Sequence, residues 1–432
     1  MKVELINHAC FLITASPQVR ILTDPWMSGN IFDNGWSPIV ETKLPHPDTY
    51  DYVWVSHEHP DHFSPTMFRP GGIPSTKVIL LQQRLDDQKL KNFFLSREYK
   101  VIEIPETGLE IGEVSIQGGL AKGFDSWCAI ITDGVTFLNL NDCVAFDDDR
   151  EIEAITRKIG KVDLLGIQFS LANWSGNPRD MLTPRIARDD TFIAMEKVFT
   201  KIAPAVVIPC ASFSYFTHEE NFHLNENAIK LPALLSRFPH INFCVLGCGD
   251  YWTDSMSSWD NSHGCSYWEE MIAQRARLPL LVTKTISFDK MQEQFAKMIA
   301  ALNSGNDLKL LYEEMKTYDK TDAAKVYVRD HQQALSYSIF SGLEKIEANE
   351  GECDVSLSSE TLFNIMKYPW GFGTLMVNGR FVANYSSFDR FASHCRLYYM
   401  NNIDKYFPQH ISVEEIVDPP SLVSRLIKQI NS

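Results

Sequence analysis

Residues 57 to 62, HEHPDH, concentrate side chains that bind metal ions. His57 and His59 are two residues apart, so at the end of a strand both side chains lie on the same side. Asp61 and His62 are adjacent and can turn towards a neighbouring point. Imidazoles and a carboxylate suit zinc, iron or manganese without any thiolate. The motif therefore predicts one or two divalent metal ions, zinc or iron, held by these four residues.

The elements that must position this motif are strands. The run DYVWVS directly before it is apolar and typical of a β-strand, and similar short runs rich in Val, Ile, Leu and Phe fill the first third of the chain. Helical patterns then alternate with buried strands, as in DREIEAITRKIG followed by VDLLGIQFS. Strands followed by helices in each of two halves favour an α/β sandwich with helices outside the sheets.

The motif resembles the His-X-His-X-Asp-His signature of the metallo-β-lactamase fold superfamily. NHACFLI and ILTDPWMSG resemble the opening of that fold, and FLNLNDC resembles the strand that delivers its bridging aspartate, here Asp142. DLLGIQFSLANWSG and KIAPAVVIPCASFSYFTHEEN are similar to the metal-binding part of CMP-N-acetylneuraminate hydroxylases. The resemblance implies a four-layer αββα sandwich over residues 1 to 262. It also implies that His218 is the late histidine ligand, with His223 as the alternative.

Two features depart from these families. The superfamily usually has a histidine shortly before the bridging aspartate, whereas QGGLAKGFDSWC has none, and Asp125 is the nearby residue that could substitute as a ligand. One centre could therefore be weakly filled or hold an open position. The loss of a ligand would also suit a degenerate, non-catalytic binding protein, which is a hypothesis beside the two enzymatic ones given below. The hydroxylases also carry a Rieske iron–sulfur domain, but the chain contains no Cys-X-His followed by Cys-X-X-His.

The expected reaction follows from the metal ions. We expect a metallohydrolase in which metal-bound hydroxide attacks a small polar ester, lactone, amide or phosphodiester, with Asp61 and Asp142 as catalytic residues. The alternative is a non-haem iron oxygenase that hydroxylates a sugar-like or amino-acid-like substrate with electrons from a separate donor. His8, Asn173 and Arg179 are candidate substrate-binding residues. His8 ends a predicted strand near the same edge, and Asn173 and Arg179 lie in a polar loop that follows a buried strand.

Residues 263 to 432 are expected to form a helical linker and a small α+β domain. FDKMQEQFAKMIAALN is an amphipathic helix, and FGTLMVNGRFVANY predicts a hairpin turning at Asn378 and Gly379. A helix followed by a hairpin resembles a sterol-carrier-like lipid-binding unit, and the aromatic residues there also suit core packing.

Composition excludes several classes of protein. The 432 residues include 40 Lys and Arg against 55 Asp and Glu, a net charge of −15, which disfavours nucleic acid and anionic lipid as partners. No apolar run is long enough to predict a membrane span. Nine cysteines without a framework spacing favour reduced thiols and a cytoplasmic protein.

Overall fold

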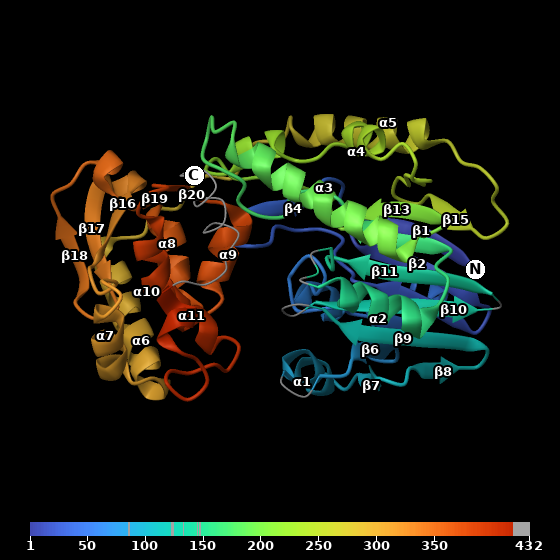
Figure 1. Ribbon diagram of the computed structural model, residues 1–432, viewed down its shortest axis with the longest axis horizontal. Helices are drawn as coiled ribbons and strands as arrows, with labels where there is room; N and C mark the ends of the chain where they lie inside the picture. Colours follow the sequence, from blue (N-terminus) through green and yellow to red (C-terminus); the bar gives the residue numbers. More distant parts are fainter. Residues whose placement is uncertain (85–86, 122–124, 133, 145, 147, 418–432) are drawn as a thin grey trace.

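The computed structural model describes residues 1–417 except 85–86, 122–124, 133, 145 and 147. The described chain forms two lobes side by side, an N-terminal sandwich of two sheets and a C-terminal lobe of one sheet and several helices (Figure 1). No described helix is both long and apolar enough to cross a membrane.

The N-terminal lobe is built on two large sheets. The first has seven strands, in the order β15 (Tyr251–Thr253), β1 (Lys2–Asn7), β2 (Cys10–Ser16), β3 (Val19–Thr23), β5 (Tyr52–Trp54), β6 (Val78–Gln82) and β7 (Lys100–Ile104). The second has six, in the order β13 (Val206–Cys210), β12 (Leu164–Gln168), β11 (Val135–Asn141), β10 (Ser126–Thr132), β9 (Val114–Leu120) and β8 (Leu109–Ile111). A two-stranded ribbon pairs β14 (Ser214–Phe216) with β4 (Trp36–Pro38).

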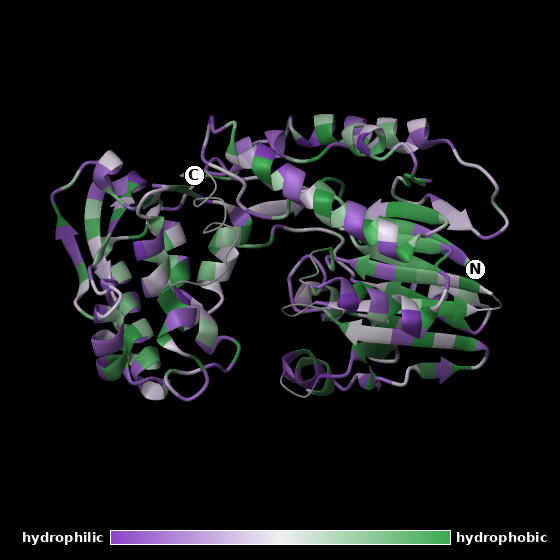
Figure 2. Cartoon of the chain, in the orientation of Figure 1, coloured by the Kyte–Doolittle hydropathy of each residue, from purple (hydrophilic) through white to green (hydrophobic). Residues whose placement is uncertain are grey.

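Helices cover the outer faces of the two sheets. The helices of this lobe are α1 (Lys89–Leu95), α2 (Asp149–Ile159), α3 (Thr183–Ile202), α4 (Leu231–Arg237) and α5 (Asn261–Arg275). As the helical pattern predicts, Ile152, Ile155 and Ile159 of α2 are buried in the main core cluster. Interior strands are strongly hydrophobic, whereas the helices alternate in hydropathy (Figure 2). The arrangement confirms the predicted αββα sandwich.

The C-terminal lobe has its own sheet and hydrophobic core. Its strands are β18 (Gly342–Ile346), β17 (Gln333–Ser338), β16 (Ala324–Val328), β19 (Val355–Leu357) and β20 (Phe381–Ala383). Its helices are α6 (Phe288–Gly305), α7 (Leu308–Lys316), α8 (Ser359–Lys367), α9 (Gly371–Asn378), α10 (Phe388–Asn401) and α11 (Val413–Val417). The core cluster of this lobe is separate from that of the sandwich.

The predicted hairpin at Asn378 and Gly379 is wrong. The segment before the Asn-Gly pair is helix α9, and Gly379 ends it with a positive φ of 64°. Glycine in this left-handed conformation terminates helices as well as forming tight hairpin turns, so the same dipeptide fits both structures.

The segment between α5 and α6 is held against the sandwich. Leu281 donates a backbone hydrogen bond to Thr217 and accepts one from Glu219, both at 2.9 Å. Trp268 of α5 packs in the main core of the sandwich. The domain boundary between residues 262 and 263 stays a prediction.

Candidate metal centre

The ends of several strands meet at one edge of the sandwich. His8 follows β1 directly, His57 lies three residues beyond β5, and Asp142 follows β11 directly. Asp125 directly precedes β10, which is antiparallel to β11 and therefore starts where β11 ends. Strands from both sheets thus deliver imidazoles and carboxylates to a single place, where sites form in α/β proteins.

The first ligand set combines two histidines and one carboxylate. His57, His59 and Asp125 each offer a ligand atom, and these atoms lie within 4.8 Å of one another. The Nε2 atom of His57 is 3.0 Å from Nδ1 of His59 and 3.5 Å from Oδ1 of Asp125. The structure thus brings Asp125 to the His57 and His59 side chains, at the position expected of a substitute ligand.

The second ligand set has the same composition. His8, Asp61 and His62 offer ligand atoms within 4.8 Å of one another, and all three residues are buried. Oδ2 of Asp61 lies 3.4 Å from Nε2 of His8 and 3.6 Å from Nε2 of His62. His8, which sequence reasoning assigned to substrate binding, therefore lies among the candidate metal ligands.

Asp142 lies between the two sets. Its Oδ1 atom is 3.3 Å from Nε2 of His62, and its Oδ2 atom is 4.0 Å from Nε2 of His57. Gln168 donates a hydrogen bond to Oδ1 at 3.2 Å. One carboxylate that faces both sets is suited to a position between two cations, because its negative charge lowers their mutual repulsion.

Several buried polar atoms of these residues have no hydrogen-bond partner. They are both ring nitrogens of His8, Nε2 of His62 and Oδ1 of Asp61. Buried polar atoms normally have partners, so an exception requires an explanation such as an ion. His8, Asp61 and His62 fit a divalent metal ion on this ground, and the other ligand set and Asp142 fit by the chemistry of their donor atoms. We call all seven residues the metal-ligand cluster: His8, His57, His59, Asp61, His62, Asp125 and Asp142.

A buried carboxylate orients His62. Asp24 accepts hydrogen bonds from the backbone nitrogen and the hydroxyl of Ser56, at 2.8 and 2.9 Å. Its Oδ2 atom lies 3.0 Å from Nδ1 of His62. A proton on Nδ1 leaves Nε2, which faces Asp61 and Asp142, with a lone pair for a cation.

Burial and neighbouring charges change the protonation of the cluster. Burial, aided by the charges of His62 and His59, holds the pKa of His57 well below its usual value. Burial also disfavours charge on His62, but Asp142, Asp61 and Asp24 raise its pKa well above the usual value. Neutral His57 is ready to bind a cation, whereas metal binding at His62 must displace a proton.

The backbone is strained beside the site. His8, Asp24 and Asn141 have positive φ angles of 32°, 37° and 40°. Such angles are uncommon in residues other than glycine and persist only where the surrounding structure enforces them. All three lie at the strand ends that deliver or orient the metal-ligand cluster.

The structure places His218 outside the metal-ligand cluster, and its assignment as a metal ligand stays a prediction. His218 follows β14, whose pairing with β4 carries the chain away from the strand ends, towards Gly35 and the C-terminal lobe. Its Nδ1 atom lies 3.6 Å from Glu220, and it joins none of the possible cation-binding groups among the described residues. The alternative, His223, contacts the backbone oxygen of Gly176 and is likewise outside those groups.

The two other predicted substrate-binding residues, Asn173 and Arg179, lie in different places. Asn173 lines a large cavity between the lobes, which His59 also lines. Arg179 is exposed on its loop and is not among the described residues that line this cavity.

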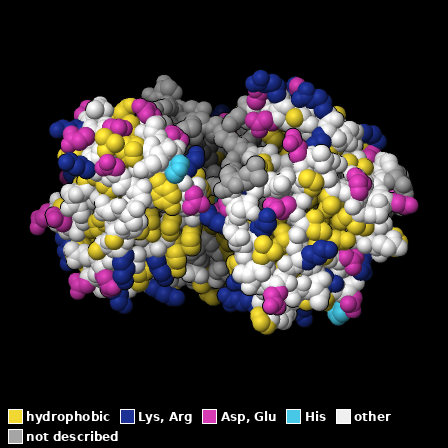
Figure 3. Space-filling model, turned by 90° about the horizontal axis from the view of Figure 1, so that it is seen from below, with side chains coloured by type: hydrophobic (Ala, Val, Ile, Leu, Met, Phe, Trp, Pro, Cys, Tyr) yellow, Lys and Arg dark blue, Asp and Glu magenta, His cyan; other side chains and the backbone are white. Residues whose placement is uncertain are grey.

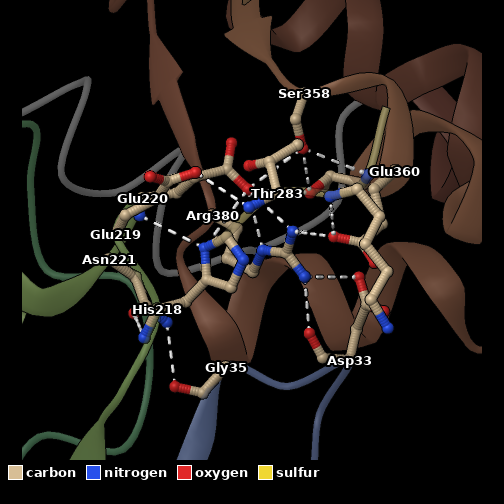
Figure 4. A network of polar contacts seen from close by, with 12 residues as sticks. Asp33, Gly35, His218, Glu219, Glu220, Asn221, Thr283, Ser358, Glu360 and Arg380 are labelled. Atoms are coloured by element: carbon tan, nitrogen blue, oxygen red, sulfur yellow. Dashed lines mark hydrogen bonds and ion pairs between the residues drawn. The ribbon is translucent and has the colours of Figure 1, made fainter. Parts of the chain in front are cut away.

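Sequence reasoning missed a second buried charged cluster, at the contact between the lobes (Figure 4). Arg380 is fully buried and makes ion pairs with Asp33 at 3.1 Å, Glu220 at 2.8 Å and Glu360 at 2.9 Å. Burial raises the pKa of Asp33 to about 6. We call these five residues the Arg380 cluster: Asp33, His218, Glu220, Glu360 and Arg380. A single Arg after a predicted turn carried no sequence signal for this role.

A family model described as the beta-lactamase superfamily domain matches residues 2–138. Residues 2–138 thus resemble a beta-lactamase superfamily domain. The matched segment contains β1, β5, most of the strand that leads to Asp142, and five members of the metal-ligand cluster besides Asp125. The match confirms the resemblance to the metallo-β-lactamase fold superfamily.

Curated relatives extend the similarity beyond the superfamily domain. A Mycolicibacterium smegmatis protein named for a Rieske 2Fe-2S iron–sulfur centre is 27% identical over 194 residues, 42% of this chain and 36% of the relative. The cytidine monophosphate-N-acetylneuraminic acid hydroxylase of Asterias rubens is 22% identical over 260 residues, 55% of this chain and 39% of the relative. The chain thus spans less than half the length of each of these relatives.

Solved structures with similar folds have different activities in their names. One is an isothiocyanate hydrolase from Delia radicum gut bacteria, with 14% identity, a TM-score of 0.42, and coverage of 60% of this chain and 100% of that chain. Another is CmlA, a diiron β-hydroxylase from Streptomyces venezuelae, with 14% identity, a TM-score of 0.34, and coverage of 66% of this chain and 52% of that chain. At these scores neither structure identifies a reaction.

Proposed function

We propose that this protein is a dioxygen-dependent hydroxylase with two iron ions. The composition of the two ligand sets carries the proposal: each combines two histidines and one carboxylate. Two imidazoles and one carboxylate around open positions are typical of non-haem Fe(II) oxygenases. Zinc accepts the same ligands, so the proposal reverses the order of the two reactions expected from the sequence because of the names of the curated relatives, which favour iron.

The curated relatives support the same reaction class. One is named as a hydroxylase and another for a Rieske 2Fe-2S iron–sulfur centre. The seven gathered side chains, with unpartnered atoms at His8, Asp61 and His62, argue against a vestigial site.

The residues of the metal-ligand cluster would have different roles in holding the two ions. When bound, the iron pair supplies the binding and reduction of dioxygen. His57, His59 and Asp125 would hold one ion, and the His8, Asp61 and His62 set would hold the other. Asp142 places negative charge between the two cations, and Asp24 keeps the His62 ring in the orientation that binds.

The reaction needs electrons from outside the described chain. One oxygen atom of dioxygen enters a C–H bond of the substrate, and the other leaves as water after taking up two electrons and two protons. A separate ferredoxin-type or flavoprotein donor would supply the electrons. Tyr399 lines the cavity, and burial, with the charges of Glu58 and Asp125, raises the pKa of Tyr399.

Metal content and the response to dioxygen test the proposal. Protein purified without chelator should contain about two iron atoms per chain. Anaerobically reduced iron-loaded protein should develop an optical band when dioxygen is added, and the Asp125→Ala variant should lose one iron and the band. The matched control is Asp51→Ala, an acidic residue paired with Arg20 away from the site. Two zinc ions in the purified protein, together with an iron form inert to dioxygen, would overturn the proposal.

Hydrolysis is the second candidate function. The same imidazoles and carboxylates accept zinc, and hydrolysis needs no electron donor, whereas the sequence contains no Rieske motif. Zinc-loaded protein that cleaves p-nitrophenyl esters, with activity lost in His59→Ala, would favour this reaction.

A further inference from the structure

A large cavity lies between the two lobes and reaches the metal-ligand cluster. Its volume is about 960 Å³, in the range of sites that enclose a small molecule. His59 lines the cavity and also belongs to the first ligand set. Seen from below, the molecule is hollowed between the lobes (Figure 3). A molecule in the cavity therefore has direct access to the candidate metal centre.

The walls of the cavity are mainly apolar and aromatic. Phe32, Phe63 and Phe93 line the wall from the sandwich. The Phe32 ring lies edge-on to the ring of His59, with centroids 6.1 Å apart, so the apolar wall begins at a candidate ligand. The rings of Phe63 and Phe93 are 4.7 Å apart and extend the wall away from the metal centre.

The opposite wall comes from the C-terminal lobe. Trp370, Met376 and Tyr399 contribute to it from the chain around α9 and α10. Trp370 is 50% exposed, although its ring stacks on that of Tyr368 with centroids 4.8 Å apart. A half-exposed tryptophan in a cavity is a surface that an apolar ligand can cover.

The two cations among the described residues of the lining, Lys89 and Arg396, already have partners within the protein, and its two carboxylates are Asp33, which pairs with Arg380, and Glu58. Lys89 donates a hydrogen bond to the backbone oxygen of Asn402. Arg396 donates one to the backbone oxygen of Ile416, at 2.9 Å. A nucleotide sugar would require cations for its phosphates and many donors for its hydroxyls, so this lining suits a hydrocarbon better.

We infer that the substrate carries an apolar acyl chain, which occupies the cavity while the reacting carbon lies next to His59. The inference rests on the proposed function and names its substrate class. It differs from the sugar-like or amino-acid-like substrate expected from the sequence, because the C-terminal lobe adds an apolar wall that the motif alone does not predict. The C-terminal lobe thereby selects the substrate.

Binding of a fluorescent acyl chain tests this inference without using the reaction. The probe is dansyl-undecanoic acid, titrated into full-length protein treated with chelator. We expect saturable binding with one site per chain and an increase in dansyl fluorescence. Dodecan-1-ol should displace the probe although it has no carboxylate, and acetate should not. Each methylene added to a competing alcohol should strengthen displacement about two- to fourfold until the cavity is full.

Two variants of the cavity and one control locate the binding. Trp370→Ala should weaken probe binding at least about fivefold, because it removes a large aromatic contact. Thr374→Trp should abolish binding by filling the cavity, which Thr374 lines. Tyr312→Ala removes a 38% exposed aromatic residue of α7, outside the lining, and should leave binding unchanged. Circular dichroism confirms that each variant is folded.

The outcomes separate this inference from the proposed function. If the protein binds the probe, Thr374→Trp loses this binding, and the iron-loaded protein is inert to dioxygen, the acyl-chain pocket is supported and the hydroxylase function is rejected. An iron protein that responds to dioxygen but binds no probe would retain the hydroxylase and overturn the pocket. Binding that is equal in Thr374→Trp and in the original protein would also overturn the pocket.

Discussion

The metal-ligand cluster and the Arg380 cluster are both buried groups of histidines and acids, but different partners complete them. In the Arg380 cluster, one guanidinium lies among three carboxylates at 2.8 to 3.1 Å, so the protein supplies its own cation. In the metal-ligand cluster, His8, Asp61 and His62 retain buried atoms without a hydrogen-bond partner. The Nε2 atom of His218 in the Arg380 cluster also lacks a hydrogen-bond partner, so the clearest difference is that the protein supplies an arginine cation to the carboxylates of one cluster and, among the described residues, pairs no arginine or lysine with those of the other.

The two clusters also differ in where they lie. The Arg380 cluster joins the lobes: Asp33 and Glu220 come from the sandwich, and Glu360 and Arg380 from the C-terminal lobe. The metal-ligand cluster belongs to the sandwich alone. Damage to the first should lower stability, whereas damage to the second should change metal binding.

The largest effect is expected from Arg380→Met. This change leaves three buried carboxylates without their cation and should lower the free energy of unfolding by about 3 to 5 kcal/mol. Urea denaturation of metal-free protein measures it. Arg329→Met is the matched control: Arg329 pairs with Glu220 alone and its side chain is 30% exposed, so we expect about 1 kcal/mol or less. Equal losses in the two variants would contradict the comparison.

Metal removal should have the next largest effect. A chelator should lower the free energy of unfolding by about 3 to 4 kcal/mol relative to protein at a free metal concentration of roughly 100 to 1,000 times Kd. Thermal unfolding with and without chelator measures this difference. Arg380→Met should retain the full chelator effect, whereas His62→Ala should lose at least half of it. If the chelator leaves the free energy of unfolding unchanged, the metal-ligand cluster is not a metal site.

Asp33 should make the Arg380 cluster sensitive to pH. Burial raises its pKa to about 6, so the folded state binds the proton more tightly than the unfolded state. The free energy of unfolding should therefore fall as the pH rises from about 4 to about 6, by up to about 3 kcal/mol. Asp33→Asn should flatten this slope in urea denaturation at stepped pH. Asp48→Asn, at a side chain that is 88% exposed, should not.

The smallest effect is expected from Asp24→Asn, which perturbs the orientation of a ligand without removing one. The change weakens the contact that fixes the His62 ring, and should lower metal affinity about 10- to 100-fold. Competition with a chromophoric chelator measures the affinity. The control Asp51→Asn should leave the metal affinity unchanged. An unchanged metal affinity in Asp24→Asn would contradict the orienting role of Asp24.

Sequence reasoning predicted the elements and most of the metal-ligand cluster because both depend on local patterns. Strand periodicity and the HEHPDH motif place His57, His59, Asp61 and His62 at a strand end. Asp125 and Asp142 lie at neighbouring strand ends, so a layered α/β arrangement suffices to bring them near.

The differences between the sequence-based assignments and the structure concern long-range structure. His8 and His218 both follow strands and are both 1% exposed, so local sequence does not distinguish them. The pairing of β14 with β4 decides that His218 leaves the strand-end edge, and no local pattern encodes that pairing. The partners of Arg380 are likewise distant in sequence, with Asp33 347 positions away.

The hydrogen bonds that hold Leu281 have a consequence for protein engineering. Because the connection is fixed to Thr217 and Glu219, a chimaera that exchanges the C-terminal lobe should be cut near residue 287, after this seam. A donor lobe joined there must supply an arginine facing Asp33 and Glu220. Such grafts would exchange the wall that the C-terminal lobe gives to the cavity while keeping the metal-ligand cluster.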